Sequence, residues 1–276
     1  MINTLNNHIQ SRPHNPTAQT WHLYAAILLF IAAVAVYWMP GGLETGFLDL
    51  QQLSWSTPEG LWSKITFIGD KWVALTLGLI IAVRYPRYLL TLLFAALLST
   101  ALAYGFKQLI DTPRPGASLP LDQFRQIGSV LLHTSTPSGH TTAAFTLAGL
   151  AMSLFRQPMC QALFLLLAAL VGYSRIAVGV HWPVDVLSGA GLGLFSAWAA
   201  VWLGKRFETL LTPALYVIIV LCLIGSAIRL ISYTGGFDNI TLFAIAISAF
   251  CLGSFAGDVV RYWGRSDKLP AENPQA

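Results

Sequence analysis

Long apolar runs alternate with short polar stretches along this chain, and most runs are close to the roughly 20 residues that cross a bilayer as one helix. The weakest of them are the run that opens with Asp70 and Lys71 and the pair at 159–203, which a stretch with charged residues interrupts. The pattern predicts eight membrane-spanning helices, at about 22–39, 70–84, 88–106, 140–155, 159–176, 183–203, 212–232 and 240–258. The predicted fold class is therefore all-α, a polytopic membrane helix bundle.

The composition agrees with this prediction. Of the 276 residues, 55% are hydrophobic and only 10% are charged, whereas soluble domains carry about 25% charged residues. The net charge of +4 is small and its basic residues are scattered, which excludes a nucleic-acid partner. The cysteines Cys160, Cys222 and Cys251 lie in apolar stretches and match no metal-ligand or redox spacing, so we interpret them as packing residues.

The positions of lysine and arginine predict the orientation, because cytoplasmic loops carry an excess of both. They place both termini in the cytoplasm and two longer loops, 40–69 and 107–139, outside. Residues 1–20 lack the features of a signal peptide and are predicted to be a cytoplasmic arm before a retained first helix. Residues 119–132 form either an amphipathic helix at the interface or a loop packed on the bundle. The polar C-terminal end is predicted to be disordered.

The first polar cluster, KQLIDTPRP at 107–115, lies at the outer end of the third predicted helix. One interpretation is that Lys107 and Arg114 extend to the lipid headgroups. The other interpretation is that Arg114 binds an oxyanion. The prolines on both sides of Arg114 favour it, because they fix the backbone around a guanidinium that can form two hydrogen bonds to such a group.

The second cluster, STPSGH at 135–140, starts the fourth predicted helix. Thr136 is the predicted N-cap and Pro137 the first helical residue, so the backbone amides of Ser138, Gly139 and His140 would point out of the helix. Such a helix end attracts anions, and glycine lets an anion approach the backbone closely. His140 is then either a cap or interface residue or a catalytic group.

The third cluster, SRIAVGVHWPVDV at 174–186, separates the fifth and sixth predicted helices. Pro183 favours a helix that begins near Trp182, which puts Asp185 one turn beyond His181. A carboxylate at this spacing can accept a hydrogen bond from one ring nitrogen of His181 and leave the other free to attack. The alternative is a helix-capping aspartate beside an incidental histidine.

All three clusters lie at outer helix ends in this topology, so the sequence predicts that they form one site. Charged groups are costly at a membrane boundary unless they are paired or functional. Several cations with free amides and no matching carboxylates are typical of a site for a multiply charged anion, and phosphate fits best. The candidate residues are Lys107, Arg114, Ser138, Gly139, His140, Arg175, His181 and Asp185.

The three motifs resemble those of the type-2 phosphatidic acid phosphatase family, also called the lipid phosphate phosphatases. The family pattern is KxxxxxxRP, then PSGH, then SRxxxxxHxxxD, and this chain matches every motif position in that order. The resemblance covers about residues 60–205 and implies a six-helix phosphatase core. The chain is accordingly predicted to consist of an N-terminal arm at 1–20, the core at 21–206, two additional transmembrane helices at 207–260 and a cytoplasmic tail at 261–276.

The resemblance also implies the role of each site residue. His181 would be the nucleophile that forms a phosphohistidine, Asp185 would orient it, and His140 would protonate the leaving oxygen and later help to activate water. It implies no metal ion and no cofactor, because cations and amides neutralise the transferred phosphoryl group. His133 matches no family position and is interpreted as a solvated or interfacial residue. The residues that would hold the phosphoryl oxygens are Lys107, Arg114, Ser138, Gly139 and Arg175.

The implied function is hydrolysis of a phosphomonoester or pyrophosphate of a membrane lipid, on the periplasmic or exterior face of a bacterial cytoplasmic membrane. Bacterial family members act on undecaprenyl pyrophosphate, phosphatidylglycerol phosphate, phosphatidic acid or lipid A phosphates. No obligate protein partner is implied. Two alternatives remain open: a phosphotransferase that passes the phosphoryl group to another lipid, and a transporter or flippase with ionisable residues along a substrate path.

Overall fold

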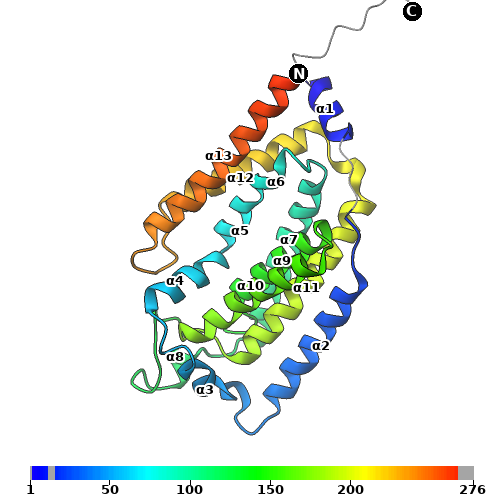
Figure 1. Ribbon diagram of the computed structural model, residues 1–276. Helices are drawn as coiled ribbons and strands as arrows, with labels where there is room; N and C mark the ends of the chain where they lie inside the picture. Colours follow the sequence, from blue (N-terminus) through cyan, green and yellow to red (C-terminus); the bar gives the residue numbers. More distant parts are fainter. Residues whose placement is uncertain (1, 12–15, 267–276) are drawn as a thin grey trace, which may run out of the picture.

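Helices make up all the regular structure in the described part of the chain, residues 2–11 and 16–266 of a computed structural model (Figure 1). The all-α prediction is confirmed. The long helices are α2 (Thr20–Tyr37), α7 (Tyr88–Ile110), α9 (Gly139–Leu154), α10 (Pro158–Ala177), α11 (Pro183–Arg206), α12 (Pro213–Ile231) and α13 (Thr241–Ser266). The short elements are α1 (Ile2–Ser11), η1 (Gly42–Glu44), α3 (Phe47–Gln52), α4 (Glu59–Ile68), α5 (Lys71–Leu77), α6 (Leu79–Ala82), α8 (Pro115–Ser118) and η2 (Glu208–Leu210).

Six of the described helices are long and apolar enough to cross a membrane: α2, α7, α10, α11, α12 and α13. Helices α4, α5 and α6 form a seventh crossing if they count together as one bent span. The remaining predicted span corresponds to α9, which has 16 residues and so extends only about 24 Å. The protein is therefore a multi-pass membrane helix bundle, and the count of eight spans stays a prediction.

The second predicted span, 70–84, is wrong as a single straight helix. The apolar helical stretch starts earlier, at Glu59, and bends by 58° between α4 and α5, as in a broken span or a re-entrant loop. Asp70 is the N-cap of α5, since its side chain accepts a hydrogen bond from the backbone N–H of Trp72 at 2.8 Å. A capping aspartate satisfies a backbone amide at a new helix start, which explains why the apolar run is interrupted here.

Small residues let α11 pack directly on the backbone of α9. A Cβ atom on Gly189 would lie 2.7 Å from the carbonyl oxygen of Ser138, and one on Gly193 would lie 2.6 Å from that of Thr142. Close approach of this kind is how helices associate inside a membrane. It fixes the first turn of α11 against the first residues of α9, where the Ser138 N–H donates to the carbonyl of Asp185 at 2.9 Å.

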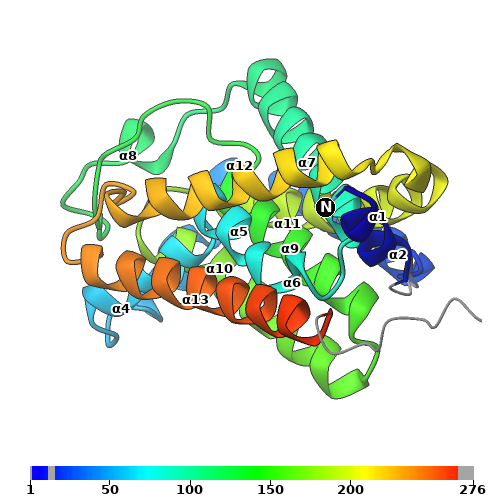
Figure 2. The ribbon, with the colours of Figure 1, turned by 90° about the horizontal axis from the view of Figure 1, so that it is seen from above.

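The last two long helices are part of the same packed body as the rest of the bundle. Seen from above, α12 and α13 flank α5 and α6 (Figure 2). Leu230, Phe237 and Ile240 share a buried apolar cluster with Phe67 of α4 and Val178 after α10. The division into a core at 21–206 and additional helices from 207 stays a prediction, but these helices do not stand apart from the core.

The predicted arm at 1–20 contains a helix, α1, that packs on the bundle. Ile9 is buried, and the Arg87 side chain donates to its carbonyl at 3.1 Å. The ring centroids of His8 and Tyr262 lie 4.0 Å apart, so α1 contacts the end of α13. The two helices meet at the end of the bundle opposite α3 and α8 (Figure 1). Helix α13 extends past the predicted boundary at 260, and residues 267–276 of the predicted tail lie outside the described residues.

Candidate active site

The loop between α8 and α9 frames one end of the site. Residues 119–132 form no helix, so the packed loop was the correct alternative. Phe124 and Ile127 are buried, and the N–H of Ile127 donates to the carbonyl of Val178 at 3.1 Å. His133 is exposed, as predicted.

His181 and Asp185 form the predicted pair. Their Nδ1 and Oδ2 atoms lie 3.0 Å apart, and the side chains are 3% and 0% exposed. Asp185 Oδ2 also accepts from the backbone N–H of Trp182 at 2.9 Å and from the Ser135 hydroxyl at 2.5 Å. Its Oδ1 accepts from the Thr136 hydroxyl at 2.5 Å. With its carboxylate so firmly held, Asp185 fixes a proton on Nδ1 of His181 and leaves the lone pair on Nε2.

Arg114 faces that second nitrogen. Its Nη1 lies 3.2 Å from Nε2 of His181 and donates to the carbonyl of Val180 at 3.0 Å. Its Nε donates to the carbonyl of His133 at 2.9 Å. The guanidinium is thus fixed in one pose beside the atom that would attack phosphorus.

Three buried or half-buried cations surround His181 without acidic partners. Lys107 donates to the carbonyls of Thr134 and Ser135. Arg175 donates from Nη1 to the Thr66 hydroxyl, and its buried Nε has no hydrogen-bond partner. Among the residues that the structure describes, neither these two nor Arg114 has a carboxylate oxygen within 4.0 Å. Such a cluster favours an anion carrying more than one charge.

His181 is neutral in this setting. Burial, together with the positive charges of Arg114, Arg175 and Lys107, holds the pKa of His181 well below its usual range. A neutral imidazole has the free lone pair that a nucleophile needs. Since the same three cations lower the electron density of an approaching phosphoryl group, they favour the attack as well.

The start of α9 differs from the prediction. Ser138, and not Thr136, is the N-cap, and its hydroxyl accepts from the N–H and the hydroxyl of Thr141. The Ser138 amide donates to the carbonyl of Asp185, so it joins the start of α9 to α11, while the Ser138 hydroxyl caps α9. Thr136 instead binds Asp185, a role that was not predicted from the sequence.

The anion site at Gly139 and His140 stays a prediction. Amides in a first helical turn have no partner within the helix, and their partial positive charge favours an anion. A Cβ atom on Gly139 would meet no atom within 4 Å, so this glycine borders open space at the start of α9.

Replacing Gly139 with alanine is expected to raise KM for a phosphorylated substrate about tenfold while the protein folds normally. The added methyl group meets no protein atom but occupies space in front of the amides, which costs one hydrogen bond to a charged oxygen, about 1.5 kcal/mol. Steady-state kinetics with purified protein measure this. Gly225→Ala is the matched control, because its Cβ also meets open space on a helix away from the site. An unchanged KM in Gly139→Ala would contradict an anion site at α9.

The second histidine, His140, has a carboxylate partner that the sequence did not indicate. Its Nε2 lies 3.8 Å from Oδ2 of Asp70, and its side chain is 28% exposed. The spacing along the chain could not reveal this pair, because 70 residues separate the two positions. The only signal was a charged residue at the start of an apolar run.

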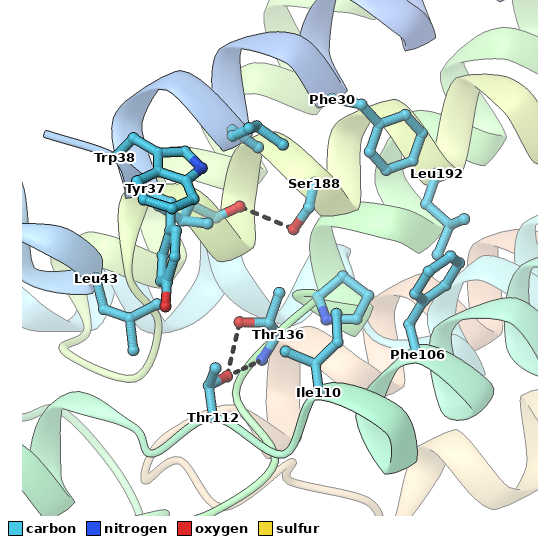
Figure 3. Close-up of a pocket in the computed structure, with 14 residues that line it drawn as sticks. Phe30, Tyr37, Trp38, Leu43, Phe106, Ile110, Thr112, Thr136, Ser188 and Leu192 are labelled. Atoms are coloured by element: carbon cyan, nitrogen blue, oxygen red, sulfur yellow. Dashed lines mark hydrogen bonds between the residues drawn. The ribbon is translucent and has the colours of Figure 1, made fainter.

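An apolar groove lies next to the site, between α2, α7 and α11 (Figure 3). Its volume is about 390 Å³. Tyr37, Trp38 and Phe106 line it, and Thr112 and Thr136 form its polar border with hydrogen bonds of 2.7 and 3.0 Å to each other (Figure 3). Because Thr136 also binds Asp185, the groove ends within one side chain of the His181–Asp185 pair.

Comparison with known families identifies the segment that carries this site. Residues 88–209 match the family model of the PAP2 superfamily, and this range contains every site residue predicted from the sequence. The resemblance is thereby confirmed. The match thus covers one segment of a multi-pass membrane protein, while Asp70 and the helices α12 and α13 lie outside the matched range.

Two curated relatives are similar over part of the chain. The undecaprenyl-diphosphatase of Sulfolobus acidocaldarius is 30% identical over 137 residues, which cover 47% of this chain and 62% of the relative. The bacitracin transport permease protein BcrC of Bacillus licheniformis is 37% identical over 98 residues, 34% of this chain and 45% of the relative. The chain thus spans about half the length of these relatives.

A solved structure is similar in fold. The transmembrane PAP2 type phosphatidylglycerolphosphate phosphatase of Bacillus subtilis superposes with a TM-score of 0.52, over 68% of this chain and 98% of that chain. The sequences are 21% identical in this comparison. The likeness therefore supports the arrangement of the helices.

Proposed function

We propose that this protein is a lipid phosphatase that removes a terminal phosphate from a membrane lipid through a phosphohistidine on His181. The observation that carries the proposal is the setting of His181: Nδ1 is held by Asp185, and Nε2 faces Arg114 among cations that lack carboxylate partners. A neutral, oriented imidazole beside an anion site is what nucleophilic attack on phosphorus requires.

In the first step, Nε2 of His181 attacks the terminal phosphorus, and the bond between this phosphorus and the oxygen that joins it to the rest of the lipid breaks. His140 gives a proton to that oxygen, so the products are the lipid with one phosphate fewer and an Nε2-phosphohistidine. Lys107, Arg114, Arg175 and the α9 amides neutralise the phosphoryl oxygens throughout. Asp185 stabilises the positive charge that forms on the His181 ring.

In the second step, water attacks the phosphohistidine. His140, now deprotonated, takes a proton from the water, the bond between phosphorus and Nε2 breaks, and inorganic phosphate leaves. This step returns the proton to His140 and the lone pair to His181, so the residues are ready for another cycle.

The groove beside Thr136 supports a lipid as substrate. Its apolar and aromatic walls suit a hydrocarbon chain, while its polar end lies next to Asp185. The similarity to the undecaprenyl-diphosphatase of Sulfolobus acidocaldarius favours undecaprenyl diphosphate within this class. The distribution of lysine and arginine favours an active site on the extracytoplasmic face of the cytoplasmic membrane.

The test is phosphate release by purified protein from a panel of lipid phosphates in detergent: undecaprenyl diphosphate, phosphatidylglycerol phosphate and phosphatidic acid. Release from at least one of them, with undecaprenyl diphosphate fastest, is expected. If label from the phosphoryl group appears in an acceptor lipid instead of as free phosphate, the phosphotransferase alternative holds. If no lipid is cleaved or phosphorylated but one is moved across vesicles, the transporter alternative holds.

Phosphate release is expected to continue in excess EDTA at no less than about half of the untreated rate. Lysine, arginine and helix amides already supply the positive charge that a metal would bring to phosphoryl transfer. The measurement is the initial rate before and after chelation, with magnesium-saturated EDTA as the control. Abolition of activity that one divalent ion restores would refute the proposed mechanism.

A further inference from the structure

The carboxylate beside His140 comes from the bend in the second crossing. Gly69 lies directly against the first turn of α9, since a Cβ atom there would lie 3.0 Å from the carbonyl oxygen of His140. The chain turns by 58° at this point and continues into α5 from Asp70. The bend therefore delivers Asp70 to His140, at 3.8 Å between Oδ2 and Nε2.

The two oxygens of Asp70 have different partners. Oδ1 accepts the backbone N–H of Trp72 at 2.8 Å, which is the capping interaction. Oδ2, the atom that faces His140, accepts the hydroxyl of Tyr233 at 3.0 Å. The N-cap role thus accounts for one oxygen only, and the other is oriented toward the site by a second residue.

Tyr233 belongs to the turn between α12 and α13, outside the segment that matches the PAP2 superfamily. Its ring stacks on Phe67 at 6.2 Å between centroids. Burial and the neighbouring Asp70 carboxylate raise the pKa of Tyr233 to about 12. The phenol therefore stays protonated and donates a hydrogen bond to Asp70. The last two helices therefore fix the position of Asp70.

His140 needs such a partner for electrostatic reasons. It lies within electrostatic range of Lys107, Arg114 and Arg175, and all three oppose a positive charge on it. A general acid must carry its second proton before the lipid oxygen leaves. Asp70 is the carboxylate within 4 Å of His140 among the described residues, and a carboxylate at this distance favours the protonated ring.

We infer that Asp70, held by Tyr233, is a positioning residue that orients His140 and stabilises its protonated form for proton transfer to the leaving lipid oxygen. The inference rests on the proposed function. With Nε2 directed at Asp70, Nδ1 is the nitrogen that donates to the lipid oxygen. The separation of 3.8 Å is longer than a hydrogen bond, and such contacts commonly shorten when substrate binds.

The Asp70→Asn variant separates this role from helix capping. Asparagine caps helices as well as aspartate does, so the start of α5 survives while the negative charge is lost. Tyr233→Phe removes only the hydrogen bond to Oδ2. Asp258→Asn and Tyr216→Phe are matched controls, because their partners, Arg84 and the carbonyl of Ala82, lie outside the site.

The experiment compares leaving-group release in the first turnover from a long-chain alkyl phosphate and from p-nitrophenyl phosphate. An alkoxide leaves only when it is protonated, whereas p-nitrophenolate leaves without a proton. Asp70→Asn is expected to slow release from the alkyl phosphate about 10- to 100-fold, with KM within about twofold and release from p-nitrophenyl phosphate slowed less than about threefold. Tyr233→Phe is expected to show the same selectivity with a loss of about three- to tenfold.

Equal losses on both substrates, a change confined to KM, or wild-type rates in Asp70→Asn would each overturn the inference while wild-type protein still releases phosphate. If wild-type protein and His181→Ala release equally little from both substrates, the proposed function fails and the inference fails with it. The two failures are therefore distinguished within one set of measurements.

Discussion

His181→Ala is expected to abolish phosphate release, with a loss of at least about 10⁴-fold, or roughly 5 kcal/mol of transition-state stabilisation. Asp185 holds His181 in hydrogen-bond range at 3.0 Å, whereas the other histidine with a carboxylate beside it, His140, serves as the proton donor in the proposed mechanism, so no neighbour can take over the attack. The measurement is initial-rate phosphate release in detergent. Acid quenching destroys a phosphohistidine, so the intermediate is sought after an alkaline quench, and the variant is expected to form none.

His22→Ala is the matched control for this variant. His22 is also buried and lies near the start of α2, away from the site, so its removal tests the effect of losing a buried imidazole. Comparable thermal unfolding of the two variants would show that loss of activity in His181→Ala is chemical. A phosphorylated intermediate that persists in His181→Ala would assign the nucleophile to another residue.

Asp185→Asn is expected to lower kcat about 10³-fold with little change in KM. The asparagine oxygen can replace Oδ2 opposite Ser135, Trp182 and His181, and its amide then faces the Thr136 hydroxyl, which can accept a hydrogen bond. The fold is thus kept. The variant loses the negative charge that stabilises the His181 ring as it becomes positive during the attack.

Asp258→Asn serves as the control, because Asp258 of α13 pairs with Arg84, which lies in the turn after α6 and away from the site. Its rate is expected to stay within about twofold of wild type, on the scale of a surface ion pair. If Asp185→Asn keeps more than a tenth of the wild-type kcat, Asp185 is a capping residue and the alternative considered for the sequence is correct.

Local spacing predicted the features of the site that lie within one helix turn. The pair at 181 and 185 formed as expected, because Pro183 starts α11 and residues four apart lie on the same face of a helix. The long apolar runs predicted the helical bundle for the same reason, since a bilayer leaves a chain few other ways to satisfy its backbone.

Contacts between distant segments were not predictable in this way. The Asp70–His140 pair and the hydroxyl groups of Ser135 and Thr136 on Asp185 depend on how a bend and a loop pack in three dimensions. The N-cap of α9 was misplaced by two residues, because both Thr136 and Ser138 are good capping residues and Pro137 suggested the earlier start. Only the packing of α11 on α9 decides between them.

The contact between Arg114 and Nε2 of His181 occupies the lone pair of the proposed nucleophile. The lone pair becomes available only when something draws the guanidinium away, and a phosphoryl group with two negative charges does this better than a phosphodiester with one. Ordinary membrane phospholipids, which are phosphodiesters, vastly outnumber any lipid with a terminal phosphate. On the proposed mechanism the enzyme thus selects its substrate by charge before shape, and it does not cleave the abundant phosphodiester lipids.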